Sequence, residues 1–227
     1  MKYVFFDTET TSLDLVDKIS KDTNKIVKLK DAAEVIQFAG FITDDNFRIV
    51  DGFNLYCSTT ELISEGAKNV HHITDELCNK LSKGMFLEDW LSNKKYHWLL
   101  SDPDICFVSY NIDFDKTVIN QTLKKHGYEP VNFGRELTCL PKINTRGRFN
   151  MCMMKATKKA LGGFKFLKLS EVVSKTVKAT EREIEEQFKR ACETLKIPNS
   201  SGVYHDALYD TYCMILVLYA NLRYYCR

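Results

Sequence analysis

Short hydrophobic runs, each ending at a polar turn, recur through the first half of the chain. Runs of β-branched and aromatic residues bounded by turn-forming residues are typical of buried strands. On this basis we predict strands at residues 2–6, 34–42, 47–56 and 104–110. The sequence Asp44-Asp45-Asn46 separates the second strand from the third and predicts a hairpin turn between them.

Hydrophobic residues at helical spacing fill much of the remaining sequence. This pattern predicts helices over residues 61–79 and 84–100, a helix that stops at Gly127, and a final helix from about His205 to Tyr225. A glycine just past the last periodic residue is a usual stop signal. Strands that alternate with helices indicate an α/β fold built on a mixed sheet.

The length and composition fit a single globular domain. The chain has 227 residues, of which 44% are hydrophobic and 27% charged, enough to bury a substantial core. It contains no internal repeat or low-complexity linker, so we expect one domain over residues 1–227. Residues 14–31 are polar and predict a loop or insertion. Residues 180–196 form a strongly charged helix with a thin apolar stripe, which predicts a helical insertion at about 178–200.

The cysteines and the N-terminus bear on where the protein resides. Eight cysteines are scattered without a Cys-x-x-Cys pair, which argues against a zinc or disulfide framework and favours a reducing environment. The longest apolar stretch, residues 212–220, is shorter than the roughly 20 residues of a membrane helix. In the N-terminal sequence MKYVFFDTET the apolar run is short and acidic residues follow soon after, so we do not expect a secretory signal. We therefore expect a soluble intracellular protein, cytoplasmic or nuclear, with no membrane contact.

Basic residues gather in one segment although the whole chain is nearly neutral. The formal net charge is +2, so an affinity for nucleic acid must come from local clustering. Residues 142–168 contain eight Lys or Arg residues and no Asp or Glu, interspersed with Phe149, Phe164 and Phe166. This combination predicts a groove that follows a nucleic-acid backbone and stacks its bases. An ordinary solvated surface is the alternative.

Three pairs of acidic residues lie where a predicted strand or helix meets a turn. They are Asp7 with Glu9, Asp113 with Asp115, and Asp206 with Asp210. Buried carboxylates that converge would repel one another unless divalent cations lie between them. Side chains alternate along a strand, so Asp7 and Glu9 face the same way and can reach one ion. Oxygen ligands favour Mg²⁺ or Mn²⁺ over Zn²⁺, and two such ions can hold the attacking and leaving oxygens of a phosphoryl displacement.

Three segments resemble the motifs of the DnaQ-like, or DEDDh, 3′–5′ exonucleases. They are Asp7-Thr-Glu-Thr-Thr, Asn111-Ile-Asp-Phe-Asp115 and His205-Asp-Ala-Leu-Tyr-Asp210, and they occur in the order of that family. The segment Val70-His-His-Ile-Thr is similar to the family's Val-His-Gly-Ile-Thr sequence beside the substrate cleft. Three motifs in order are far more specific than one. The resemblance spans nearly the whole chain and implies a ribonuclease-H-like mixed β-sheet flanked by α-helices.

The resemblance implies a role for each carboxylate. Asp7, Glu9 and Asp210 would bind the more tightly held of two ions, and Asp7 would bridge to the second ion. Asp115 would support that second ion directly or through water. His205 would be the general base that takes a proton from the attacking water, and a histidine with an ordinary pKa of about 6.5 suits that task at neutral pH.

The resemblance also implies a set of substrate-binding residues. Thr10 and Leu13 would contact the terminal nucleotide, and His71 and Asn111 would lie beside it.

The chain departs from the family pattern at several positions. Ser12 stands where glycine is common, His72 replaces the glycine of the Val-His-Gly-Ile-Thr sequence, and Tyr110 stands where histidine is frequent. These changes bear on the shape of the cleft and on the choice of substrate. Asp113 adds a second carboxylate to the middle motif, and we prefer Asp115 as the ligand because it matches the Phe-Asp ending.

Several of these acidic residues, and His205, also have a structural interpretation. Asp115 could cap the helix that follows it, and Asp206 is better explained as a first-turn helix acid than as a ligand. His205 could be a surface residue at a helix start, and Asp7 and Glu9 could be solvated at a strand end. The presence of all three motifs together favours the catalytic interpretation.

The sequence therefore predicts a 3′–5′ exonuclease that uses two Mg²⁺ or Mn²⁺ ions. We expect DNA with single-stranded or frayed 3′ ends as the substrate and nucleoside 5′-monophosphates as the products. An exoribonuclease and a non-catalytic nucleic-acid-binding module on the same fold are the alternatives. A polymerase or another replication or repair protein is the expected protein partner, and the oligomeric state is left open.

Overall fold

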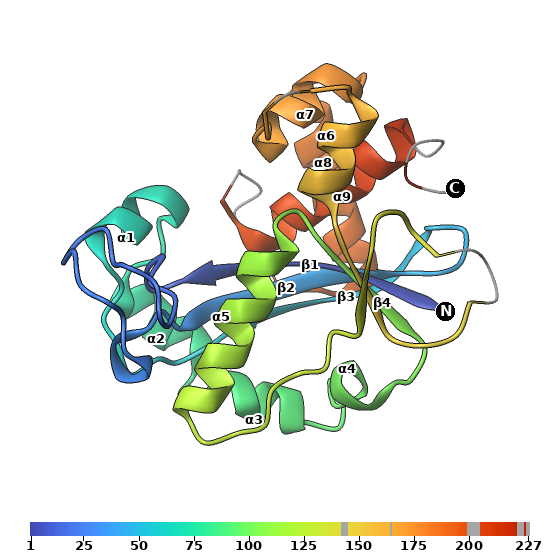
Figure 1. The fold of residues 1–227 in the computed structure, drawn as a ribbon. Helices are drawn as coiled ribbons and strands as arrows, with labels where there is room; N and C mark the ends of the chain where they lie inside the picture. The colour runs from blue at the N-terminus through green and yellow to red at the C-terminus, as the bar shows by residue number, and fades with distance from the viewer. Residues whose placement is uncertain (142–144, 164, 199–204, 222–224, 226–227) are drawn as a thin grey trace.

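A six-stranded mixed sheet lies between two layers of helices in the computed structural model (Figure 1). The structure describes residues 1–141, 145–163, 165–198, 205–221 and 225. The strands are β1 (Lys2–Thr10), β2 (Val35–Thr43), β3 (Ile49–Tyr56), β4 (Ile105–Ser109), β5 (Arg135–Leu137) and β6 (Phe149–Cys152). The helices are α1 (Glu65–His71), α2 (Asp75–Ser82), α3 (Leu87–Ser92), α4 (Trp98–Ser101), α5 (Ile112–Lys125), α6 (Met153–Ala160), α7 (Leu169–Thr176), α8 (Glu181–Leu195) and α9 (Ala207–Ala220), with a short 3-10 helix η1 (Leu29–Asp31).

The strand order is β3-β2-β1-β4-β6-β5, which puts β1 in the interior of the sheet. β1 pairs antiparallel with β2 and parallel with β4, and β4, β6 and β5 continue in parallel. The predicted α/β class with a mixed sheet flanked by helices is confirmed. Among the residues described, no helix combines the length and apolarity that crossing a bilayer requires.

Alternation along β1 divides the core into two layers. Tyr3 and Phe5 pack with α7, α8 and α9, whereas Val4 and Phe6 pack with α3 and α5 on the other face. Helices α6–α9 accordingly lie on one side of the sheet and α3–α5 on the other (Figure 1). The odd-numbered positions of β1 therefore face α9, and this parity decides where the carboxylates at the end of the strand point.

β1 is longer than predicted. It continues through Asp7 and Glu9 to Thr10, because Asp7 pairs with Ala39 and Glu9 with Gln37 in the neighbouring strand β2. The register shifts between Glu9 and Thr10, and the pairing ends with Thr10 opposite Val35. The acidic motif is thus the end of a paired strand, not the polar turn that we expected after Phe6.

The predicted helices over 61–79 and 84–100 are wrong as continuous elements. The first is interrupted between α1 and α2, where His72 has a left-handed backbone and the side chain of Thr74 caps the next helix. The second is interrupted between α3 and α4, where Asn93 is extended. Hydrophobic spacing continues across both breaks and conceals them.

The basic segment 142–168 is folded more closely into the domain than expected. It contains β6 and α6, and Phe149 is only 7% exposed, so the prediction that Phe149 stacks on bases is wrong. Phe166, by contrast, is 51% exposed. Lys142 and Phe164 lie outside the residues described.

The charged helix α8 forms within the predicted range. Its apolar stripe, Ile184, Phe188 and Cys192, is buried in the core layer that contains α9. Its description as an insertion stays a prediction. The last helix, α9, ends at Ala220, before the predicted Tyr225, and His205 precedes it.

Candidate active site

Three carboxylates meet where the end of β1 lies against the first turn of α9. Oxygen atoms of Asp7, Glu9 and Asp210 all lie within 4.8 Å of one another. Asp7 and Glu9 reach this point because odd positions of β1 face α9. Asp206 is the N-cap of α9, since its side chain accepts hydrogen bonds from the N–H groups of Leu208 and Tyr209. Asp206 therefore starts the helix that presents Asp210, and it is a cap, not the first-turn acid that we predicted.

Gln37 also fixes the start of α9. Its side-chain oxygen accepts a hydrogen bond of 3.3 Å from the N–H of Ala207, and its backbone pairs with Glu9. The residue is fully buried and has apolar neighbours on both sides in the strand. We did not assign it a role, although a glutamine inside the run Val-Ile-Gln-Phe-Ala is a visible signal of a buried polar contact.

Asp115 approaches the same place from the other face of the sheet. It lies in the first turn of α5, is 2% exposed, and accepts hydrogen bonds from the hydroxyls of Thr8, at 2.7 Å, and Ser109. Asp115 is not part of the group of three that lies within 4.8 Å. Its negative charge nevertheless raises the pKa values of Asp7 and Glu9. Thr8 and Ser109 are contacts that the motif comparison did not reveal.

Asp113, the other carboxylate of the middle motif, forms ion pairs outside the cavity. Its oxygens form ion pairs with Lys116, at 2.7 Å, and Lys155, at 2.6 Å. These lysines lower its pKa. Asp113 does not line the cavity in which the other carboxylates lie.

The four carboxyl groups at this site all have raised pKa values, because nearby positive charge does not offset their burial and mutual repulsion. Burial raises the pKa of Asp210 to about 7 and that of Asp115 to about 6. The pKa values of Asp7 and Glu9 are raised well above their ordinary range, first by burial and then by the neighbouring carboxylates. Oδ1 of Asp210 is buried and accepts no hydrogen bond within the described part of the chain. An orphaned oxygen among clustered hard oxygen ligands fits a divalent cation such as Mg²⁺ or Mn²⁺.

His205 lies immediately before α9 with a left-handed backbone, φ 66°. Its backbone N–H donates a 3.3 Å hydrogen bond to Oδ2 of Asp210, which holds the main chain of His205 beside that carboxylate. Burial, followed by the positive charge of Lys168, lowers the pKa of the His205 ring. The ring is therefore neutral at pH 7 and able to accept a proton.

A cavity of about 530 Å³ connects these groups. All the site residues predicted from the sequence line it except His71. It is also lined by residues outside that predicted set, among them Val70, Phe114, Met154 and residues 166–170; Phe166 and Lys168 belong to the basic segment that we predicted to contact nucleic acid.

His71 does not line this cavity but contacts the backbone of Thr10, which does. The side chain is 8% exposed. Its Nδ1 accepts a 3.0 Å hydrogen bond from the N–H of Ile73, so the ring proton is on Nε2. Nε2 donates a 3.2 Å hydrogen bond to the carbonyl of Thr10. The ring lines an adjoining cavity of about 490 Å³, which shares Thr10 and Leu13 with the first. His72 follows with φ 61°, a conformation that suits glycine, which explains why the family pattern has glycine here.

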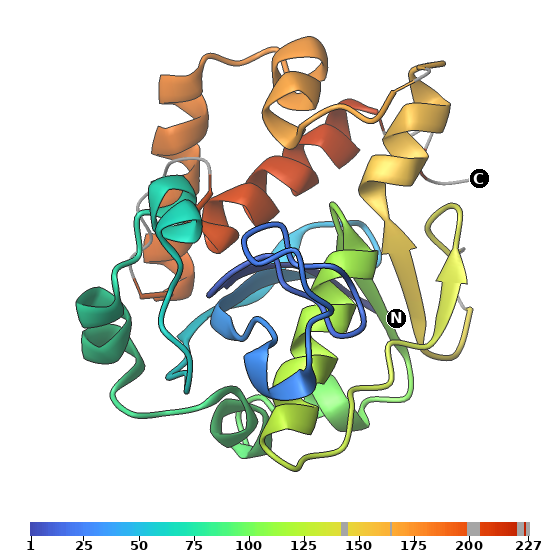
Figure 2. The ribbon, with the colours of Figure 1, turned by 60° about the vertical axis from the view of Figure 1, so that its left-hand side comes forward.

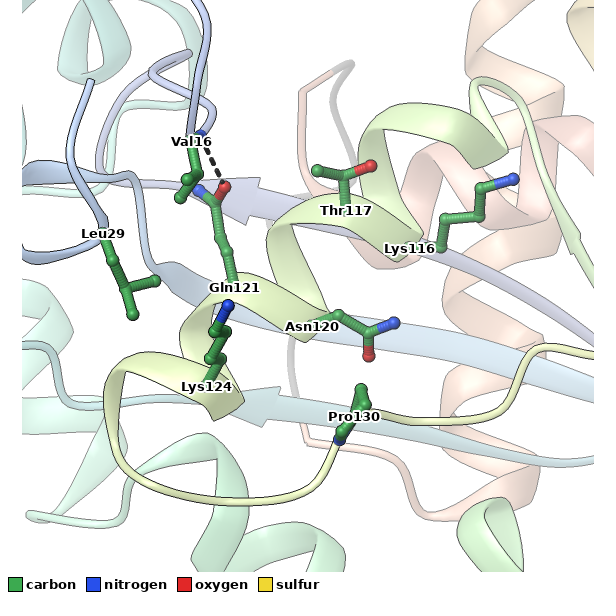
Figure 3. A pocket seen from close by; sticks show the side chains of 8 residues that line it. All are labelled: Val16, Leu29, Lys116, Thr117, Asn120, Gln121, Lys124 and Pro130. Carbon is green, nitrogen blue, oxygen red and sulfur yellow. Dashed lines mark hydrogen bonds between the residues drawn. The ribbon is translucent and has the colours of Figure 1, made fainter. Parts of the chain in front are cut away.

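Another cavity, of about 420 Å³, lies between α5 and the 14–31 segment (Figure 3). Gln121 spans it and accepts a 3.2 Å hydrogen bond from the N–H of Val16. Lys116 and Lys124 also line it, but none of the four carboxylates does. This cavity lacks the groups for phosphodiester chemistry.

The model of an exonuclease family, named for RNase T, matches residues 4–218. The chain belongs to this exonuclease family. Among curated proteins, the PolC-type DNA polymerase III of Staphylococcus aureus (strain bovine RF122 / ET3-1) is 33% identical over 132 residues, which is 58% of this chain and 7% of the polymerase. The PolC-type enzyme of Staphylococcus epidermidis (strain RP62A) matches to the same extent. The match thus covers only a small part of these relatives.

Solved exonuclease structures share the fold of this family member. Escherichia coli Exonuclease I in complex with a dA16 oligonucleotide superposes with a TM-score of 0.59 at 17% identity, over 99% of this chain and 42% of that one. The nuclease domain of 3′hExo, a DEDDh family member bound to rAMP, gives 0.58 at 12% identity, over 98% and 92%. Exonuclease X in complex with 5′-overhanging duplex DNA gives 0.52 at 18% identity, over 97% and 91%. The predicted ribonuclease-H-like fold is confirmed.

Proposed function

We propose that this chain is a DEDDh-type 3′–5′ exonuclease that hydrolyses phosphodiester bonds at the 3′ end of DNA and releases nucleoside 5′-monophosphates. The observation that carries the proposal is the meeting of Asp7, Glu9 and Asp210 within 4.8 Å, beside His205. The direction of hydrolysis rests on the three motifs and on the DEDDh neighbour of the same fold.

Asp7, Glu9 and Asp210 would hold one Mg²⁺ or Mn²⁺ ion, and Asp7 with Asp115 would hold a second. The orphaned Oδ1 of Asp210 and the raised pKa values of all four carboxylates support this assignment. Bound divalent ions supply the positive charge that stabilises the attacking and leaving oxygens of a phosphoryl displacement.

His205 is the proposed general base. Its lowered pKa keeps the imidazole unprotonated at neutral pH, so it can take the proton of the attacking water. The hydrogen bond from its backbone N–H to Asp210 holds the main chain of His205 beside that carboxylate, and the residue lines the same cavity. Thr10, Leu13 and Asn111, which line the same cavity, are the proposed contacts to the terminal nucleotide. His71 acts through the carbonyl of Thr10.

DNA is the preferred substrate because the curated relatives are DNA polymerases and two solved neighbours are bound to DNA. The match to part of a PolC-type polymerase also makes a replication partner our preferred protein partner. RNA is the alternative substrate, and matched oligonucleotides decide between them.

The decisive experiment follows end-labelled oligonucleotides in Mg²⁺, with and without chelator. With a 5′ label we expect a ladder of progressively shorter single-stranded DNA, and with a 3′ label immediate release of a labelled mononucleotide. Matched RNA and 5′-overhanging duplex DNA are run beside it. A first product released from the 5′ end would contradict the proposed direction.

Asp115 and Asp113, two carboxylates of the middle motif, provide a matched pair of variants. Asp115→Asn should abolish cleavage while the protein remains folded, and so should Asp7→Asn in the first motif. Asp113→Asn should retain activity, because Asp113 pairs with Lys116 and Lys155 outside the cavity. Unchanged activity in Asp7→Asn would refute the assignment.

A further inference from the structure

The residues just before α7 and the first residues of that helix form a wall of the active-site cavity, although they belong to none of the three motifs. Residues 166–170 line the same cavity as the four carboxylates. The cavity wall formed by Thr10, Leu13 and Val70 comes instead from the end of β1, the chain beyond it, and α1. In both views α6 and α7 lie apart from α1 and the 14–31 segment (Figures 1 and 2).

The backbone of this wall is fixed at two points. The hydroxyl of Tyr110 donates a 2.6 Å hydrogen bond to the carbonyl of Leu167, and the N–H of Lys168 donates a 2.7 Å bond to the carboxylate of Glu171. Leu169 is buried in the core layer beneath. A segment anchored in this way presents the side chains of Phe166 and Lys168 from a defined position.

Those two side chains have the chemistry of a nucleotide contact. The ring of Phe166 is 51% exposed, and the ammonium group of Lys158 lies 4.4 Å from its centroid. Lys168 is exposed, lines the cavity, and forms no ion pair within the part of the chain that the structure describes, although four carboxylates line the same space. An exposed aromatic ring beside an unpaired cation such as Lys168 is suited to a base and its phosphate.

We propose that Phe166 and Lys168 bind the nucleotide immediately 5′ of the one removed, Phe166 by stacking on its base and Lys168 by neutralising its phosphate. This inference rests on the proposed function. The bond to be hydrolysed must lie over the carboxylates. With the terminal nucleoside against Thr10 and Leu13, the strand leaves the carboxylates toward the wall at 166–170.

Two substrates separate this contact from catalysis. An oligo-dT strand has an upstream nucleotide, whereas the p-nitrophenyl ester of thymidine 5′-monophosphate has the terminal nucleotide and the cleavable bond alone. At pH 8 and saturating Mg²⁺, Phe166→Ala and Lys168→Ala should each lose about tenfold in kcat/KM on oligo-dT, as expected for one stacked base or one phosphate contact. On the p-nitrophenyl ester each variant should stay within about twofold of the original protein.

Conservative and neighbouring variants complete the experiment. Phe166→Trp and Lys168→Arg should retain activity on oligo-dT, and Lys165→Ala, in the same basic run but not lining the cavity, should behave like the original protein. Lys168→Ala should also reduce the slope of log kcat/KM against log salt concentration by about 0.7, the value for one phosphate of a single strand.

Each outcome bears on one claim. Equal losses on both substrates, or no loss on oligo-dT, would overturn the upstream contact while leaving the exonuclease assignment intact. An original protein that cleaves neither substrate would overturn the proposed function and this inference with it.

Discussion

His205 is the residue whose protonation should shape the pH dependence of the enzyme. Burial and Lys168 lower its pKa. The proposed general base works only when unprotonated, so the acid limb of kcat should lie below about pH 6.5. We expect His205→Asn to reduce kcat by about 10²–10⁴-fold and to abolish that limb. The profile is measured from pH 5 to 9 at saturating metal. A limb that survives in the variant would belong to another group.

At the level of single residues, the sequence predicts the carboxylates of the candidate site but not the side chains that contact them or line their cavity. Strand periodicity puts Asp7 and Glu9 on one face, and the His-x-Ala-x-x-Asp motif puts Asp210 one turn into a helix. Thr8, Ser109 and Lys168 acquire their contacts only when β1, β4 and α7 come together. No local pattern encodes such distances, so Thr8 and Ser109 were assigned no role, and Lys168 was predicted only as part of the basic segment 142–168.

Among the elements, those with strong periodicity or long apolar runs were predictable. β2, β3, β4, α5 and α8 form close to their expected bounds. The short helices α1–α4 were merged in pairs, and β5, β6, α6 and α7 were not predicted. Three- and four-residue strands offer too few positions for alternation to be visible, and caps such as Thr74 divide helices without changing hydrophobic spacing.

Helix α8 offers a test of how far a charged helix contributes to the core. Phe188 is 2% exposed and its ring contacts Phe41 of β2 and Tyr209 and Tyr212 of α9, at centroid distances of 6.5, 5.2 and 5.6 Å. We expect Phe188→Ala to lower the free energy of unfolding by about 3–5 kcal/mol because it leaves a cavity in this layer. Urea unfolding measures the change.

The matched control lies on the exposed face of the same helix. Arg182 pairs with Glu186 in solvent, so Arg182→Ala should change the free energy of unfolding by less than about 1 kcal/mol. A cost for Phe188→Ala no larger than that of the control would show that α8 is peripheral to the fold.

For the whole molecule, the candidate site is also a point of instability. Its carboxylates come from β1, α5 and α9, so folding itself brings four like charges together. This arrangement lowers the stability of the folded protein unless a cation neutralises the four carboxylates. Metal binding and global stability should therefore be coupled, and the coupling should depend on pH.

The sign of that dependence follows from the direction of the shifts. The folded-state pKa of Asp210 is about 7 and that of Asp115 about 6, against an ordinary 3.8, and those of Asp7 and Glu9 are also raised. Between about pH 4 and 7 the folded protein holds protons that the unfolded chain has released, so the metal-free protein loses stability as the pH rises through this window. An ion that binds only the folded, ionised site restores the lost stability.

Mn²⁺ should therefore raise the melting temperature more at pH 7.5 than at pH 5.5, relative to chelator. Asp210→Asn should diminish the difference, and equal shifts at both pH values would contradict the proposed coupling.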